Sequence, residues 1–137
     1  MADKPIDLFT VPGVRRIIDQ VEPDTVEKAR RAAKLLADEG VDLEIIDLRS
    51  LWPYDWEAIR ASVEKTGRLV VAHEASVIGG FGAEVVATVT EKAGYLLETP
   101  PVRVGHPDMV WGQAKLEAYS KIAPGDIIDA VRRVMVD

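Results

Sequence analysis

Two short apolar runs, separated by one helical pattern, constrain the fold of this chain most. The first reads Leu-Glu-Ile-Ile-Asp-Leu over residues 43–48, and the second reads Arg-Leu-Val-Val-Ala over residues 68–72. Such runs are typical of parallel strands that are buried on both faces of a sheet. Between them, Trp56, Ile59 and Val63 recur at helical spacing. The alternation predicts a βαβ unit and therefore a parallel sheet.

Residues that cap or break helices set the ends of the other expected elements. Asp55 is a candidate N-cap for the helix between the two runs, and Thr66-Gly67 should end that helix. A longer helix is expected from about residue 25 to 39, with Gly40 just beyond its last turn. The remaining expected elements are a strand at 6–11, at an edge of the sheet, helices at 14–21 and 83–97, a strand at 102–104, a loop from Gly105, and a helix capped by Asp126.

These elements predict an α/β fold of three layers, in which a mostly parallel open sheet carries helices on both faces. The length of 137 residues corresponds to a single compact domain. A chain of this size buries on the order of 70% of its unfolded surface. In open sheets of this kind, functional side chains gather where the strands end.

Composition excludes several classes of function. The chain has 23 acidic and 17 basic residues and a net charge of -6, so nucleic acid is not an expected partner. Its longest basic cluster, Lys28, Arg30, Arg31 and Lys34, is interpreted as the solvated face of a helix. There is no cysteine, which excludes disulfides and thiolate chemistry. No signal peptide or apolar run of about 18 residues is visible, so we expect a cytoplasmic protein with no membrane span.

His73 and Glu74 follow the second apolar run and precede a glycine-rich turn. One interpretation is an acid/base or ligand-positioning pair at a strand end. The alternative is that His73 hydrogen-bonds across a domain or subunit junction. If the strand continues through both residues, their side chains point to opposite faces of the sheet. His106 lies far along the chain from His73, and no metal site is expected.

The turn Gly79-Gly80-Phe81-Gly82 precedes an expected helix and has two interpretations. Free N–H groups at a helix start can hold an anion, which would make the chain a standalone α/β module that binds a small anion or nucleotide. However, Val85 stands where a dinucleotide fingerprint has its last glycine, and Glu84 would repel a phosphate. The alternative is a tight strand-to-helix turn with close backbone packing.

Two further groups are candidates for an interface. Asp47 and Arg49 flank Leu48, so their side chains are expected on one side, either at a subunit contact or at a solvated strand end. Trp52 and Trp111 lie in or beside loops, where large aromatic residues suggest an interface, although a core position is the alternative.

Five motifs in one order carry a family resemblance. They are Ile46-Asp47-Leu48-Arg49, Lys65-Thr66-Gly67-Arg68, His73-Glu74-Ala75, Gly79-Gly80-Phe81-Gly82-Ala83-Glu84 and Pro101-Val102-Arg103-Val104. The chain resembles the C-terminal domain of transketolase-like thiamine diphosphate enzymes. It is most similar to the beta subunit of the decarboxylase component of 2-oxo acid dehydrogenase complexes of the pyruvate or branched-chain type. The resemblance covers about residues 26–137, and residues 1–25 depart from the family pattern.

The resemblance implies a subunit-assembly and partner-docking domain that is not catalytic alone. Thiamine diphosphate and Mg²⁺ would be held in the assembled enzyme by other subunits or domains, and none by this chain. The implied partners are those cofactor-binding parts, a lipoyl acyltransferase and a second copy in a dimer. The positions that match the family's acyltransferase-docking residues are Glu98 and Asp137. A subunit of a 2-oxo acid oxidoreductase is a further alternative, although without cysteine it would carry no iron–sulfur cluster.

Overall fold

The computed structural model describes residues 6–11, 25–109 and 120–136 of the chain. The expected helix at 14–21, Trp111 and Asp137 lie outside these residues. The elements are β1 (Ile6–Val11), α1 (Thr25–Ala37), β2 (Leu43–Asp47), α2 (Trp56–Thr66), β3 (Leu69–Ser76), α3 (Phe81–Ala93), the 3₁₀ turn η1 (Gly94–Leu96), β4 (Val102–His106) and α5 (Pro124–Met135). No helix among the described residues is both long enough and apolar enough to span a membrane.

The four strands form one parallel sheet in the order β2-β1-β3-β4. The parallel sheet predicted from the apolar runs is therefore confirmed. β1 lies inside the sheet, where Leu8 is level with Ile45 of β2 on one side and with Val70 of β3 on the other. The expectation that residues 6–11 form an edge strand is wrong, because β1 pairs with β2 on one side and with β3 on the other.

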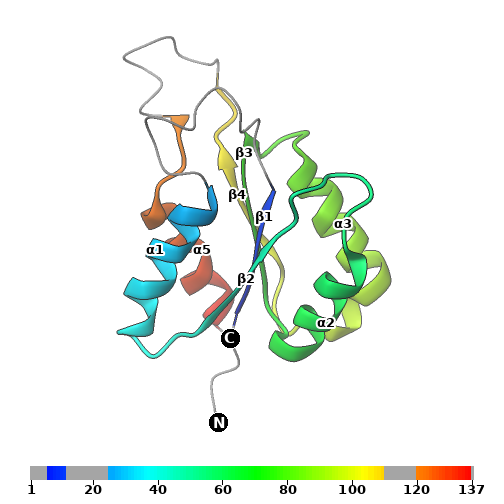
Figure 1. The fold of residues 1–137 in the computed structure, drawn as a ribbon, viewed down its shortest axis with the longest axis horizontal. Coiled ribbons are helices and arrows are strands. Elements are labelled where there is room, and N and C mark those ends of the chain that lie inside the picture. Colours follow the sequence, from blue (N-terminus) through cyan, green and yellow to red (C-terminus); the bar gives the residue numbers. More distant parts are fainter. Residues whose placement is uncertain (1–5, 12–24, 110–119, 137) are drawn as a thin grey trace.

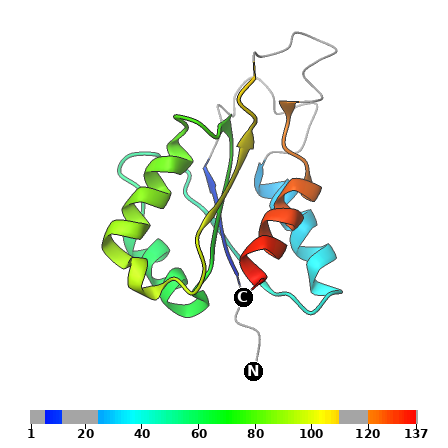
Figure 2. The same ribbon diagram turned by 180° about the vertical axis from the view of Figure 1, so that it is seen from behind.

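Helices cover both faces of the sheet, as the three-layer prediction requires. α1 and α5 pack on one face, and α2 and α3 pack on the other (Figures 1 and 2). Each face has its own apolar cluster. The α1/α5 cluster is built around Leu36, Val70 and Val131, and the α2/α3 cluster around Ile59, Val71 and Val89. Val70 and Val71 are neighbours in β3, so this strand is buried on both faces.

The helix ends follow the local signals in the sequence. The Asp55 carboxylate accepts the Ala58 N–H at 3.0 Å, which confirms the predicted N-cap of α2. α2 ends at Gly67, whose φ of 69° lets its N–H reach the Val63 carbonyl at 2.8 Å. Beyond α1, Gly40 also has a positive φ, and the chain turns directly into β2.

Several boundaries differ from the expectation. β3 continues to Ser76, so His73 and Glu74 are part of the strand, and β4 continues to His106, so the expected loop does not begin at Gly105. α3 is shifted toward the N-terminus and ends in the turn η1. Asp126 is not the N-cap of α5. The helix begins at Pro124, and the Asp126 side chain accepts the Ala123 N–H at 2.6 Å.

Candidate functional site

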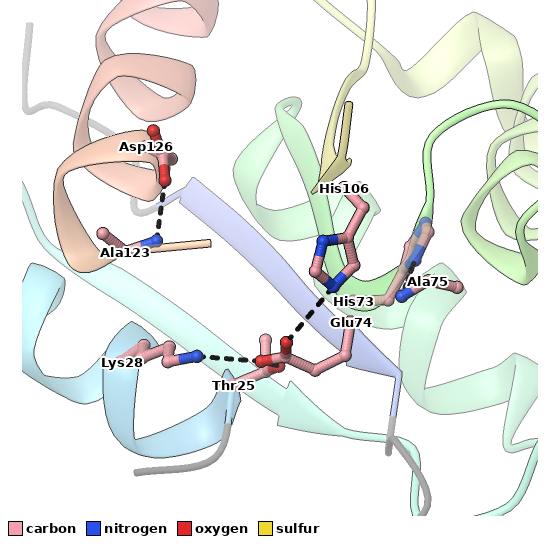
Figure 3. Close-up of polar contacts among 8 residues, drawn as sticks. All are labelled: Thr25, Lys28, His73, Glu74, Ala75, His106, Ala123 and Asp126. Atoms are coloured by element: carbon pink, nitrogen blue, oxygen red, sulfur yellow. Dashed lines mark hydrogen bonds and ion pairs between the residues drawn. The ribbon is translucent and has the colours of Figure 1, made fainter. Parts of the chain in front are cut away.

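The candidate site lies toward the carboxyl ends of β3 and β4 (Figure 3). Between Ala72 and Ser76 the pairing of the two strands is irregular, because four residue steps on β3 face only two on β4, from Val104 to His106. The extra length lies in the stretch that contains His73 and Glu74. Because β3 continues through both residues, they belong to opposite faces of the sheet, as the sequence predicted.

Glu74 belongs to the face covered by α1, and side chains of α1 donate hydrogen bonds to its carboxylate. Its Oε1 accepts hydrogen bonds from Thr25 Oγ1 at 2.8 Å and from Lys28 Nζ at 3.0 Å. Its Oε2 lies 3.8 Å from Nε2 of His106. The Lys28 side chain is 8% exposed and that of Glu74 is 29% exposed. Buried charges are tolerated when they are paired and hydrogen-bonded, and this cluster meets that condition.

The interpretation of Lys28 as part of a solvated helix face is therefore wrong. The spacing of residues in the sequence could have predicted that Lys28 is buried. Lys28 falls on the stripe of α1 that faces the core, whose buried members are Thr25, Lys28, Ala29, Ala32 and Leu36. This spacing is that of a helix face, and Lys28 is the one charged residue on it. Thr25, Lys28 and His106 are the cluster members that the sequence did not indicate as candidates for this site.

His73 belongs to the opposite face and is 1% exposed. Its Nδ1 accepts the Ala75 N–H at 3.1 Å, so the proton of the neutral ring is on Nε2. Nε2 has no hydrogen-bond partner among the residues that the structure describes. Burial lowers the pKa of His73, and the nearby Arg103 guanidinium lowers it further. The imidazole is therefore neutral near pH 7.

Three glycines surround the His73 ring. A Cβ atom placed on Gly82 would overlap Cδ2 and Nε2 of His73. A Cβ on Gly80 would lie 2.7 Å from Cε1 of the ring, and one on Gly105 would lie 3.1 Å from the same atom. The imidazole thus occupies the space beside the Gly79-Gly80-Phe81-Gly82 turn. This favours the close-packing interpretation of the turn over the anion cradle.

Asp47 and Arg49 lie apart from this cluster, at the end of β2. Arg49 Nε is 3.1 Å from Asp47 Oδ2, and the Arg49 N–H donates to Oδ1 of the same carboxylate at 3.2 Å. The Arg49 side chain is 76% exposed. The two residues therefore pair with each other on the surface, and a role at a subunit contact stays a prediction.

Glu98 lies at the opposite end of the sheet, after η1. Its Oε2 is 3.2 Å from Nη1 of Arg68, and its N–H donates to the Gly67 carbonyl at 2.7 Å. Arg68 is largely buried, and its Nε donates to the Val134 carbonyl at 3.0 Å. Glu98 thus has a cationic partner inside the chain. A docking role for Glu98 stays a prediction, and Asp137 is outside the described residues.

A groove that the sequence did not predict runs between β4 and α5. It has a volume of about 370 Å³ and is lined by apolar side chains, such as Val102 and Ile122, and by charged ones, such as Arg103, Asp129 and Arg133. In the described part of the chain, no three His, Asp or Glu side chains converge to hold a metal ion. These residues therefore offer no ligand set for a magnesium diphosphate.

Comparison with known proteins places these features in a family. Residues 24–127 match the family model described as Transketolase, C-terminal domain. The chain is 48% identical over 108 residues to the pyruvate dehydrogenase E1 component subunit beta of Leifsonia xyli subsp. xyli, covering 79% of this chain and 32% of that protein. It is 50% identical over 104 residues to the 2-oxoisovalerate dehydrogenase subunit beta of Pseudomonas aeruginosa, covering 75% of this chain and 29% of that protein.

A solved structure gives the same result for the fold. The protein described as "Split gene transketolase, inactive beta4 tetramer" matches with a TM-score of 0.72 and 33% sequence identity, over 97% of this chain and 39% of that chain. The chain spans about a third of the length of these relatives.

Proposed function

The chain belongs to the transketolase C-terminal domain family, and from this premise we propose that it is the subunit-assembly and partner-docking domain of a thiamine diphosphate-dependent 2-oxo acid dehydrogenase. The whole enzyme would oxidatively decarboxylate a 2-oxo acid and transfer the acyl group to a lipoyl group. The observation that carries the proposal is the identity of about half, over three quarters of the chain, to two beta subunits of such dehydrogenases.

The geometry at the strand ends supports a structural role for the polar residues there. A general base must reach the proton that it abstracts. The His73 ring is buried between glycines, and Oε1 of Glu74 already accepts two hydrogen bonds. Held in this way, the two residues fix the ends of β3 and β4 against α1 and α3. In this proposal they keep the docking surface in shape and leave bond breaking to other parts of the enzyme.

The thiamine diphosphate and Mg²⁺ would be bound by other subunits or domains of the same enzyme, and this domain would join them, also as a dimer. A lipoyl acyltransferase would dock at Glu98 and Asp137, and Glu98 would then share its carboxylate between that partner and Arg68. The absence of cysteine suits a reducing compartment, and the proposed location is the cytoplasm.

A reconstitution experiment tests this function. The purified chain is mixed with the thiamine diphosphate-binding polypeptides of the same organism, thiamine diphosphate, Mg²⁺ and either pyruvate or 2-oxoisovalerate, and the release of CO₂ is measured. We expect release only when the chain and those polypeptides are both present. Release by the chain alone would contradict the proposal, and so would full activity of the other polypeptides without the chain.

A further inference from the structure

Five apolar side chains lie beyond the carboxyl ends of β2 and β3, and ring contacts join three of them. Leu51, Trp52 and Tyr54 lie in the connection between β2 and α2, Ile78 lies in the connection between β3 and α3, and Phe81 is the first residue of α3. We call these five residues the aromatic ridge. The ring centroids of Trp52 and Tyr54 are 6.1 Å apart, and those of Tyr54 and Phe81 are 5.8 Å apart, both with edge-on geometry. The ring contacts thus join the connection between β2 and α2 to the first residue of α3.

The ridge is anchored at one end and exposed at the other. Tyr54 and Phe81 are partly buried against the apolar cluster under α2 and α3. Trp52 is 82% exposed, Ile78 66% and Leu51 42%. Single exposed apolar residues are ordinary, but several on adjoining connections suggest an interaction site. The contact with the Tyr54 ring restricts Trp52, so less side-chain freedom remains to be lost on binding, and Trp52 is suited to anchor a partner.

Resting on the proposed function, we propose that the aromatic ridge is the docking surface for the cofactor-binding polypeptide of the same enzyme, with Trp52 as the anchor that enters an apolar pocket of that partner. The chain spans about a third of its relatives, so the rest of such an enzyme must pack against some surface of this domain. Tryptophan and tyrosine are enriched among the residues that dominate binding energies. The neighbouring Asp47–Arg49 pair supplies both signs of charge for a polar rim.

A different polypeptide fits the ridge better than a second copy of this chain. A two-fold contact between copies would require one patch that contains both the exposed Trp52 and a pocket that receives it. The groove described above lies elsewhere, between β4 and α5 on the face of the sheet that α1 and α5 cover. A partner of different sequence can provide the pocket that the ridge needs.

The test measures binding of the chain to the purified thiamine diphosphate-binding polypeptides of the same organism. Trp52→Lys is compared with Tyr95→Lys, a matched control because Tyr95 is 78% exposed and lies in η1, beyond the far end of α3. We expect Trp52→Lys to raise the Kd about 30-fold or more, and Tyr95→Lys to change it less than about 2-fold. Both variants remove exposed side chains, and circular dichroism verifies that they fold.

The outcomes separate the ridge from the proposed function. If the complex forms and Trp52→Lys binds as tightly as the unchanged chain, the ridge is not the docking surface, although the proposed function stands. If no complex forms with the unchanged chain, both ideas are overturned. If Trp52→Lys only dissociates an assembly of this chain with itself, a second copy is the occupant and the inference is wrong. A shift of tryptophan emission to shorter wavelength on binding, absent in Trp52→Phe, would support it further.

Discussion

His73 and Glu74 are neighbours in β3, and the two faces of the sheet accommodate the buried imidazole and the partly buried carboxylate by opposite means. On the side of α3, the imidazole fits because Gly80, Gly82 and Gly105 have no side chains that would occupy its space. On the side of α1, the carboxylate is accepted because Thr25 and Lys28 donate to it.

The two means of burial fail in different ways. Where glycines leave space for a ring, adding atoms to a glycine destabilises the fold. Where two charges pair, removing one partner destabilises it. The first kind of damage is steric and does not depend on salt. The second is electrostatic, and removing both partners together corrects most of it.

The largest expected effect comes from removing the carboxylate. Glu74→Leu leaves the buried Lys28 ammonium without its counter-charge. We expect a loss of about 3 kcal/mol in the free energy of unfolding, measured by urea denaturation. The loss should exceed that of an exposed pair because the Lys28 side chain is 8% exposed.

A double variant provides the control. Lys28→Met combined with Glu74→Leu removes both charges and keeps similar side-chain volumes, so most of the lost stability should return. If the losses in the free energy of unfolding of the two single variants simply add in the double variant, Lys28 and Glu74 are not coupled as described.

Adding one methyl group on the other face should have the next largest effect. A Cβ on Gly82 overlaps His73, whose buried ring has no free space to move into. Replacing a helical glycine by alanine otherwise stabilises by up to about 1 kcal/mol. Because overpacking outweighs this gain, we expect Gly82→Ala to lower the free energy of unfolding by about 2 kcal/mol.

Gly125 supplies the matched control for this substitution. It lies in the first turn of α5, and a Cβ there has no neighbour within 4 Å. Gly125→Ala should therefore be neutral or stabilising in the same urea titration. The packing account also requires that His73→Ala restore part of the stability lost in Gly82→Ala, and a purely additive result would contradict it.

The His73 face should also respond to pH, by a smaller amount. The folded pKa of His73 lies below its ordinary value of 6.5, so the unfolded chain binds a proton more readily. Stability from this group is complete above the unfolded pKa and is lost as the pH falls through that value toward the lower folded pKa. We expect urea denaturation at about pH 7.5 and about pH 5.5 to show this decline.

His73→Gln cannot titrate in this range and serves as the comparison. Its free energy of unfolding should change less between the two pH values than that of the unchanged chain. Equal changes in the two proteins would mean that other groups cause the decline. Arg103, His106 and Glu74 also face this region, so only the difference between the two proteins is assigned to His73.

Local signals were enough to predict much of the fold. The N-cap at Asp55 and the stop at Gly67 depend on backbone geometry within a few residues, and both are confirmed. The two apolar runs indicated β2, β3 and the parallel sheet, because strands covered on both faces need apolar residues throughout. The strand at 6–11 was also predicted, but its place in the sheet depends on pairing with two distant segments.

The site was less predictable because its partners are far apart in the sequence. The expected strand ended at Ala72, because a histidine followed by a glutamate is usually exposed to solvent. Their burial depends on α1, whose Lys28 is 46 residues before Glu74, and on Gly82 and Gly105 for His73. The glycine turn was recognised from the sequence, but a glycine that holds an anion and one that admits a neighbouring ring look alike until the fold is known.

The smallest effect should come from the ion pair at the other end of the sheet. Glu98 is 40% exposed, and Arg68 retains its bond to the Val134 carbonyl when the carboxylate is lost. Glu98→Gln should therefore lower the free energy of unfolding by about 1 kcal/mol or less, and by less at about 0.5 M salt than at about 0.02 M. Urea titrations at the two salt concentrations measure this. A loss as large as that of Glu74→Leu would mean that exposure does not distinguish the two pairs. No loss at low salt would mean that the contact between Arg68 and Glu98 does not contribute to stability.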